Sequence, residues 1–282
     1  MRRHAATGEE NASSPAPLPS NDFSRISHVY DQSRTLPATE LTELYRQLMD
    51  AGVLREADRI LDVGCGTGQV SLPLVELGFD VTGIDISRDM VARAADKARG
   101  TGHARYEVAD VQALPFADGT FDVTVGSKIF QHVGNWRLAV DEVLRVTKPD
   151  RCFVHINETG AFRHAVRRPF ESAADRRGYR ERYKLGNRSE LVAYFERRAA
   201  SVAVINALDL KWEFDLTYDQ QFTDMANQLH AEFWVIPDHE FREMCSEIRR
   251  WVDEQPEGGA TAETMRAHLK LELVRRRVDT DV

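Results

Sequence analysis

A glycine-rich turn directly after a short apolar segment constrains this chain more than any other feature. Residues 59–63 read Arg-Ile-Leu-Asp-Val, and glycines follow at positions 64, 66 and 68. An apolar run of this length is typical of a buried strand. Glycines adopt backbone conformations that a Cβ atom forbids, so a strand can turn sharply there and a ligand can lie directly on the backbone. A helix behind the turn would offer unpaired N–H groups to the same ligand. The sequence therefore predicts a strand, a ligand-binding turn and a helix.

Further apolar segments alternate with helical patterns along the chain. Besides 59–63, the segments that predict strands cover residues 79–85, 104–109, 121–125, 151–156, part of 202–216, and 268–273. Helical patterns lie before and between the earlier strands, over residues 39–50, 69–77, 88–99 and 136–146. Strands that alternate with helices of this length form parallel βαβ units. The sequence therefore predicts an α/β fold with a Rossmann-like, doubly wound, mainly parallel sheet of seven strands.

Composition divides the chain into five segments. Residues 1–20 are rich in Ala, Ser and Pro and predict a disordered tail. Residues 21–58 predict an N-terminal helical segment, and residues 59–160 the sheet core. Residues 161–200 hold eleven Arg and Lys against five Asp and Glu, and predict a basic α-helical cap inserted between the fifth and sixth strands. Residues 201–282 are expected to complete the sheet and a substrate pocket.

The overall charge and the cysteines exclude several classes of protein. The net charge of −8 is a poor match for a protein that binds duplex DNA. The three cysteines, an odd and widely spaced set, indicate reduced thiols and a cytoplasmic protein. They form no zinc-binding spacing with histidine, so no metal is expected. No run of about 18 apolar residues predicts a membrane span, and no apolar segment of a secretory signal follows the N-terminal arginines.

Three carboxylates at strand ends narrow the class of ligand. The G-x-G-x-G spacing differs from the G-x-G-x-x-G of nicotinamide and flavin dehydrogenases, and Asp62 would repel a pyrophosphate but suit an amino-bearing ligand. Asp85, at the end of the second strand, could accept hydrogen bonds from two ribose hydroxyls. Asp110, after the third strand, could accept one from an exocyclic amine, while the next backbone N–H, that of Val111, donates to a ring nitrogen. An adenosine-containing ligand with an amino group fits all three.

With these features, residues 59–156 resemble the class I S-adenosylmethionine-dependent methyltransferases, in the small-molecule group that includes ubiquinone and menaquinone methyltransferases. The matching segments are residues 61–68, 83–87, 110–116, 121–122 and 142–149. The family usually has two glycines after the Lys-Pro of the last segment, where this chain has Asp150 and Arg151. That turn is therefore expected to differ in shape.

The resemblance implies S-adenosylmethionine as the cofactor, S-adenosylhomocysteine as the product, and a role for each matching residue. The implied cofactor-binding residues are Tyr30, Arg34, Asp62, Gly64, Cys65, Gly66, Gly68, Asp85, Ile86, Met90, Asp110, Val111 and Ser127. The loop glycines would line the methionine part, with Asp62 near its amino group and Ser127 near the sulfonium. Ile86 and Met90 would flank the adenine. Tyr30 would cover the cofactor, and Arg34 could reach its carboxylate.

The candidate catalytic residue is His132, in the loop after the fourth strand. Ligands bind beyond the carboxyl ends of the strands in an open α/β sheet, and an imidazole can remove a proton near neutral pH. The alternative, which the sequence slightly favours, is a structural histidine packed on the cofactor side. A base is needed only when the methyl acceptor begins protonated, as a hydroxyl does.

The basic insertion and the last third of the chain each offer a further feature with two interpretations. Five aromatic residues could line an apolar substrate pocket or belong to the core: Trp212, Phe214, Phe222, Phe233 and Trp234. The arginines of 161–200 could hold an anionic substrate or form a solvated helix face. The expected partner is a small molecule, anionic or aromatic, and the expected assembly is a monomer or homodimer.

Three functions remain open. The first is methyl transfer to a small molecule, with oxygen as the first choice of acceptor atom and nitrogen or carbon as alternatives, in specialised metabolite biosynthesis. The second is an RNA or protein methyltransferase, although the Asn/Asp-Pro-Pro-aromatic signature of nucleic-acid amino methylation is absent after the fourth strand, where Gly126 and Ser127 stand. The third is an accessory protein that binds S-adenosylmethionine without transferase activity.

Overall fold

The computed structural model describes residues 23–33, 36–160, 164–179, 188–199, 201–229 and 231–276. The tail expected over residues 1–20 lies outside these ranges. Within them, no helix combines the length and the apolar character that crossing a membrane requires.

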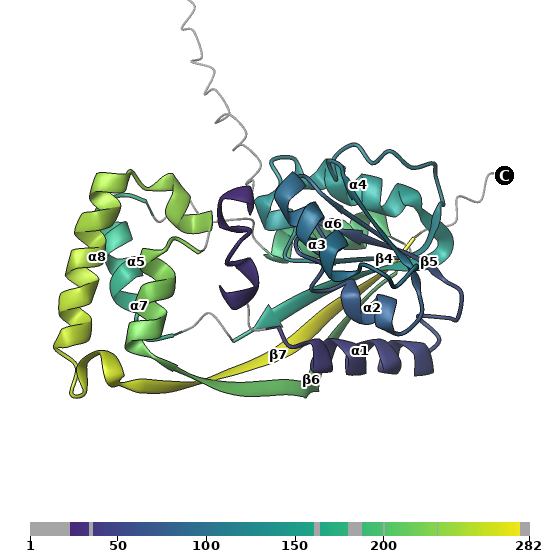
Figure 1. Ribbon diagram of the computed structural model, residues 1–282. Coiled ribbons are helices and arrows are strands. Elements are labelled where there is room, and N and C mark those ends of the chain that lie inside the picture. Colours follow the sequence, from purple (N-terminus) through teal and green to yellow (C-terminus); the bar gives the residue numbers. More distant parts are fainter. Residues whose placement is uncertain are drawn as a thin grey trace, which may run out of the picture.

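Seven strands form one sheet in the order β3-β2-β1-β4-β5-β7-β6. They are β1 (Arg59–Val63), β2 (Asp80–Asp85), β3 (Ala104–Val108), β4 (Phe121–Ser127), β5 (Thr147–Thr159), β6 (Ser201–Thr217) and β7 (Ala262–Arg275). β1 to β5 pair in parallel, and β7 lies antiparallel between β5 and β6. The predicted Rossmann-like, mainly parallel seven-stranded sheet is therefore confirmed (Figure 1).

The α-helices of the described residues are α1 (Ala38–Asp50), α2 (Leu72–Glu76), α3 (Arg88–Lys97), α4 (Trp136–Val146), α5 (Arg167–Arg176), α6 (Arg188–Arg198), α7 (Tyr218–Ala226) and α8 (Asp238–Asp253). Two apolar clusters cover opposite faces of the sheet. Ile60 of β1 packs in the cluster of α1 and α2, whereas the next residue, Leu61, packs in the cluster of α4 and α6. Neighbouring strand residues point to opposite faces, so a strand buried on both sides needs an unbroken apolar run. This explains the apolar segments that predicted the strands.

A helical lobe stands apart from the sheet core. α5, α7, α8 and the short 3₁₀ helix η5 (Ala231–Val235) share an apolar cluster centred on Phe170, Phe233 and Met244. The long strands β6 and β7 extend to this lobe, as Figure 1 shows. The expected insertion between β5 and β6 therefore divides, because only α5 joins the lobe. α6 packs against α4 on the sheet, where Phe195 is fully buried, and α7 and α8 come from the segment between β6 and β7.

The start of α2 and the turn at Asp150 are two places where the sequence predicted a local difference or a different boundary. The helix predicted over 69–77 begins only at Leu72, because Pro73 has no N–H to donate to Gln69 and residues 69–71 continue the turn. At the turn without the family's glycines, Asp150 has a φ of +62°. Aspartate is among the residues that tolerate this left-handed region, so the turn retains a conformation that glycine commonly supplies.

Candidate cofactor and substrate site

The glycine-rich turn after β1 has the left-handed backbone that its composition predicted. Gly64, Gly66 and Gly68 have φ values of +68°, +53° and +85°. A Cβ atom on Gly64 would lie 2.5 Å from Cδ1 of Ile129, so no larger residue fits there without displacement. A Cβ on Gly66 would lie 3.8 Å from the Tyr30 ring. The Tyr30 ring therefore lies over this turn.

Asp62 carries a buried carboxylate. The residue is 1% exposed, and neither carboxylate oxygen has a hydrogen-bond partner among the residues that the structure describes. Burial raises the pKa of the carboxyl to about 7; the nearby Ser71 hydroxyl opposes the increase, and the charge of Asp85 adds to it. A buried unpaired carboxylate is costly, and a ligand ammonium group would supply the missing partner. This observation fits the amino group of S-adenosylmethionine.

Asp85 connects the turn to the end of β2. Its Oδ2 accepts the Gly66 N–H at 3.0 Å, and its Oδ1 accepts the Ser87 N–H at 2.8 Å. Ser87 caps α3 by accepting the Met90 N–H. Ile86 lies at the surface with 42% exposed, whereas Met90 is buried. The carboxylate of Asp85 is thus fixed beside the glycine turn, with Ile86 at the rim.

Asp110 and Val111 lie on the neighbouring loop after β3. The Ala109 N–H donates to Asp85 O at 3.0 Å, which ties this loop to the end of β2. Asp110 Oδ1 accepts the Gln112 N–H at 2.8 Å, and the Gln112 amide donates to both carboxylate oxygens. Val111 is buried. The structure therefore brings the expected ribose and adenine residues to one edge of the sheet.

Two further residues of the expected cofactor set, Cys65 and Ser127, lie at the ends of neighbouring strands β1 and β4. Cys65 is buried and its N–H donates to Ile84 O at 2.9 Å; burial raises the pKa of its thiol well above the ordinary value, so the group stays protonated. Ser127 ends β4, in register with Ile156 of β5. The order β2-β1-β4 puts the carboxyl ends of these strands side by side, which is where ligands bind in such sheets.

Residues of the N-terminal segment contact the site in ways the sequence did not indicate. Asp31 Oδ1 accepts from the Thr67 hydroxyl at 2.5 Å, and its Oδ2 pairs with Lys97 of α3 at 2.5 Å. The hydroxyls of Ser24 and Ser87 share a hydrogen bond at 2.7 Å. Asp31 follows Tyr30, which the resemblance placed over the cofactor, but the resemblance implied no role for Asp31 itself. Arg34 lies outside the described residues.

His132 lies at an aromatic contact between the sheet core and the lobe. It ends the 3₁₀ helix η3 (Phe130–His132) after β4. The ring of Phe23, in η1 (Phe23–Ile26), is edge-on to His132 and to Trp234 of the lobe, with 4.9 Å between ring centroids in both cases. Figure 1 shows this N-terminal segment, in purple, between the core and the lobe. Trp234 is half-buried and its indole N–H donates to Gln228 O.

The other aromatic and basic candidates mostly have structural partners. Phe233 belongs to the core of the lobe, and Trp212, on β6, packs against the apolar cluster of α1 and α2. Phe222 lies under the guanidinium of Arg249, and Phe214 is half-buried on β6. Arginines of the basic insertion form ion pairs: Arg167 with Glu171, Arg176 and Arg177 with Glu247, and Arg198 with Asp141. These four arginines, of the eleven basic residues in the segment, therefore have acidic partners within the protein.

Known proteins resemble the part of the chain that carries this site. The methyltransferase domain family matches residues 61–154. The demethylmenaquinone methyltransferase of Clavibacter sepedonicus is 34% identical over 128 residues, which are 45% of this chain and 52% of the relative. The 2-methyl-6-phytyl-1,4-hydroquinone methyltransferase of Synechocystis sp. is 42% identical over 91 residues, 32% of this chain and 29% of the relative. The chain thus matches about half the length, or less, of these two relatives.

The fold extends the likeness beyond the matched sequence. The crystal structure of the YcgJ protein from Bacillus subtilis superposes with a TM-score of 0.55 at 20% identity, over 85% of this chain and all of that chain. The glycine turn at residues 64–68 lies within residues 61–154, the segment that the methyltransferase domain family matches. Residues 61–154 therefore resemble a methyltransferase domain, set in a sheet with a Rossmann-like strand order.

Proposed function

We propose that this protein transfers a methyl group from S-adenosylmethionine to a small-molecule acceptor. The observation that carries the proposal is the buried carboxylate of Asp62, which has no hydrogen-bond partner within the described part of the chain and precedes a glycine turn on which a ligand can lie. A nicotinamide dinucleotide would bring a pyrophosphate to that position, and its charge would oppose that of Asp62. An amino acid moiety brings an ammonium group instead.

The residues that would hold the cofactor follow from their positions. Gly64, Gly66 and Gly68 would line the methionine part, with Asp62 at its amino group and Tyr30 above. Asp85 would accept the ribose hydroxyls, since each of its oxygens can accept a further hydrogen bond beside the backbone donors that fix it. The adenine would lie between two pairs of residues: Ile86 at the rim with the buried Met90, and Asp110 with Val111 at the adenine edge. The sulfonium would lie near Ser127 and Cys65.

We infer that the acceptor is a hydroxylated aromatic ring, with oxygen as the first choice of atom and a ring carbon as the alternative. The aromatic residues Phe23, His132 and Trp234 meet where the N-terminal segment joins the core to the lobe. Flat apolar surfaces of this kind favour a planar ligand. The names of the two relatives specify quinone-type substrates, which agree with such a ligand.

S-adenosylmethionine supplies a methyl group already activated on a sulfonium, so the protein's part is to bind, orient and exclude water. His132 would accept the proton of the acceptor hydroxyl on an imidazole nitrogen. His132→Ala should then lower kcat tenfold or more and leave cofactor affinity intact. An unchanged kcat would assign His132 a packing role against Phe23.

Calorimetry with S-adenosylmethionine, S-adenosylhomocysteine and NAD tests the proposal directly. Binding of both adenosyl ligands and not of NAD is expected, and binding of NAD alone would overturn it. Incubation with reduced naphthoquinols and labelled cofactor, followed by NMR of the product, then distinguishes oxygen from carbon methylation. Binding without turnover on any acceptor class would favour the accessory-protein alternative, and turnover on RNA or protein alone would favour the macromolecular one.

A further inference from the structure

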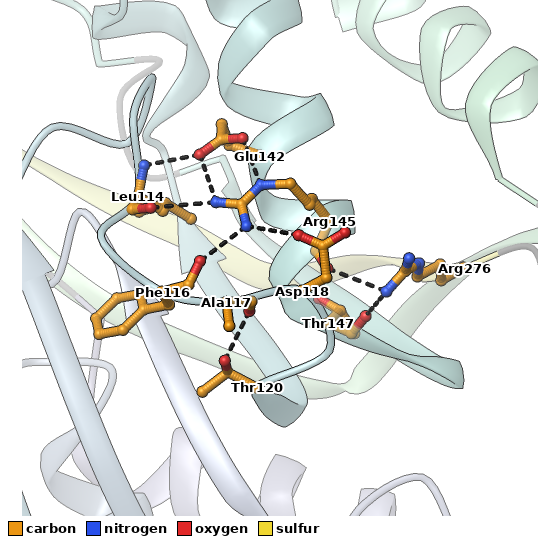
Figure 2. Close-up of polar contacts among 9 residues, drawn as sticks. All are labelled: Leu114, Phe116, Ala117, Asp118, Thr120, Glu142, Arg145, Thr147 and Arg276. Carbon is orange, nitrogen blue, oxygen red and sulfur yellow. Dashed lines mark hydrogen bonds and ion pairs between the residues drawn. The ribbon is translucent and has the colours of Figure 1, made fainter.

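Arg145, on the last turn of α4, makes an unusually complete set of hydrogen bonds to one loop. Its Nη1 donates to Phe116 O and its Nη2 to Leu114 O, at 2.8 and 3.1 Å. Nη1 also reaches Asp118 Oδ1 at 2.8 Å. Figure 2 shows the guanidinium at the centre of this loop, and only 29% of the side chain is exposed. Nε and Nη2 also donate to Glu142, so each of the three guanidinium nitrogens donates at least one hydrogen bond.

Glu142 completes the arrangement from the preceding turn of α4. Its Oε1 and Oε2 accept from Nε and Nη2 of Arg145 at 2.7 and 2.8 Å, a bidentate pair. The same Oε2 accepts the Leu114 N–H at 2.8 Å. The pair lowers the pKa of Glu142, so the charge persists at neutral pH. Leu114 is thus held through both its N–H and its carbonyl.

The loop that is held is the one expected to read adenine. It begins at Asp110 and Val111, and its other end joins β4 at Phe121, whose ring packs edge-on against Phe116. At the start of the loop, Gln112 donates to Asp110 and accepts the N–H of Asn135, the N-cap of α4. α4 therefore fixes the loop near both of its ends.

We propose that Glu142 and Arg145 are positioning residues that hold the adenine-binding loop, so that Asp110 and Val111 meet the adenine edge in one fixed geometry. The inference rests on the proposed function, because it assigns a role within that cofactor site. Neither residue is placed in contact with the cofactor. Their effect should therefore appear as discrimination between bases, since a carboxylate that is held in place rejects a group that cannot donate to it.

The test compares two ligands that differ only in the base. S-adenosylhomocysteine carries the exocyclic amine, and S-inosylhomocysteine carries an oxygen at that position. We expect the wild-type chain to prefer the adenine ligand by at least about tenfold in Kd, because Asp110 would face an acceptor in the inosine ligand. Arg145→Lys retains the charge but loses the planar fork, and should bring this ratio to within about threefold of unity, mainly through weaker binding of the adenine ligand.

Arg198→Ala is the matched control. Arg198 pairs with Asp141, the α4 residue next to Glu142, at 2.7 Å, and it makes no contact with the loop in the part of the chain described. Its removal should leave the ratio unchanged. Glu142→Gln is measured in parallel, so that the result does not depend on the folding of one variant, and thermal melts fix a temperature at which every variant is folded.

The outcomes separate the two proposals. A preserved ratio in both Arg145→Lys and Glu142→Gln, or an equal loss of affinity for the two ligands, would overturn the positioning role while leaving the proposed function in place. A wild-type chain that binds neither ligand would overturn the proposed function and this inference together.

Discussion

The ring of Phe23 lies edge-on to the imidazole of His132, with 4.9 Å between the ring centroids and an angle of 77° between the planes. The same ring makes an edge contact with Trp234 of the lobe. One residue of the N-terminal segment therefore joins the loop after β4 to a lobe built from α5 and from the segment between β6 and β7. The proposed substrate side of the site would therefore depend on residues from three distant segments.

Phe23→Ala should raise the KM of the acceptor about tenfold and leave the Kd of S-adenosylhomocysteine within about twofold, because the variant removes an aromatic surface without touching the glycine turn. Steady-state kinetics and calorimetry measure the two quantities. Phe214→Ala on β6 is the matched control. Equal effects of both variants on KM, or a large effect of Phe23→Ala on cofactor affinity alone, would contradict the assignment.

Asp31→Asn should weaken cofactor binding about three- to tenfold. The carboxylate accepts from Thr67 in the glycine turn and pairs with Lys97; the amide loses the charge of both contacts. The effect is moderate because the Asp31 side chain is 44% exposed and solvent screens the pair. Calorimetry with S-adenosylhomocysteine measures the change. Asp96→Asn, in the exposed pair with Arg99, serves as the control and should have no effect; equal losses in both variants would point to overall charge instead.

The sheet was predictable because its signals are local. β1 and β4 are short apolar runs buried on both faces, and the turn at Gly64 follows its strand directly, so periodicity and composition suffice. The positions of Asp62 and Asp85 follow from the same logic, since parallel strands end at one edge. The start of α2 was predicted three residues early, because the residues after Gly68 also fit a helical pattern.

The lobe and the covering segment were not predictable to the same degree. α5 and α6 are adjacent in the sequence and similarly basic. Yet α6 packs Phe195 into the sheet core, whereas α5 packs Phe170 into the lobe. Which surface a helix buries depends on tertiary packing that its own pattern does not encode. The contacts of Phe23 and Asp31 join residues far apart in the chain, and a single sequence carries no local signal of them.

Asp62→Asn should stabilise the ligand-free protein above neutral pH. Folding raises the pKa of the carboxyl from 3.8 to about 7, so the folded state binds the proton more tightly than the unfolded state does. The resulting penalty is absent below pH 3.8, grows as the pH rises between these values, and is complete above about pH 7. The amide avoids the buried charge but must itself be buried, so the expected gain in the free energy of unfolding at pH 8 is about 1–3 kcal/mol.

Denaturant unfolding of both proteins at pH 8 and pH 5 measures this difference. The gain should shrink at pH 5, where the wild-type carboxyl is protonated in the folded state and most of its penalty is gone. Asp110→Asn is a control, because its carboxylate is half-buried and accepts hydrogen bonds from Gln112. A gain that is the same at both pH values would mean that the charge of Asp62 is not its source.

Cofactor affinity should rise as the pH rises toward about 7, whereas the stability contributed by Asp62 falls over the same range. The ligand ammonium group needs the ionised carboxylate, so below about pH 7 binding must first remove a proton from Asp62, and Kd should increase by up to about tenfold for each unit of decrease in pH. Because the carboxylate is 1% exposed, salt should alter this dependence little.

Calorimetry with S-adenosylhomocysteine between pH 5.5 and 8.5, in pairs of buffers with different ionisation enthalpies, measures both the affinity and the protons released. Release approaching one proton is expected near pH 6, and none near pH 8.5. Asp62→Asn should bind more weakly at pH 8 and show a flat profile, because its side chain has no proton to lose. A wild-type profile as flat as that of the variant would mean that the ammonium group of the ligand binds elsewhere, and the partner of Asp62 would then have to be sought in another group.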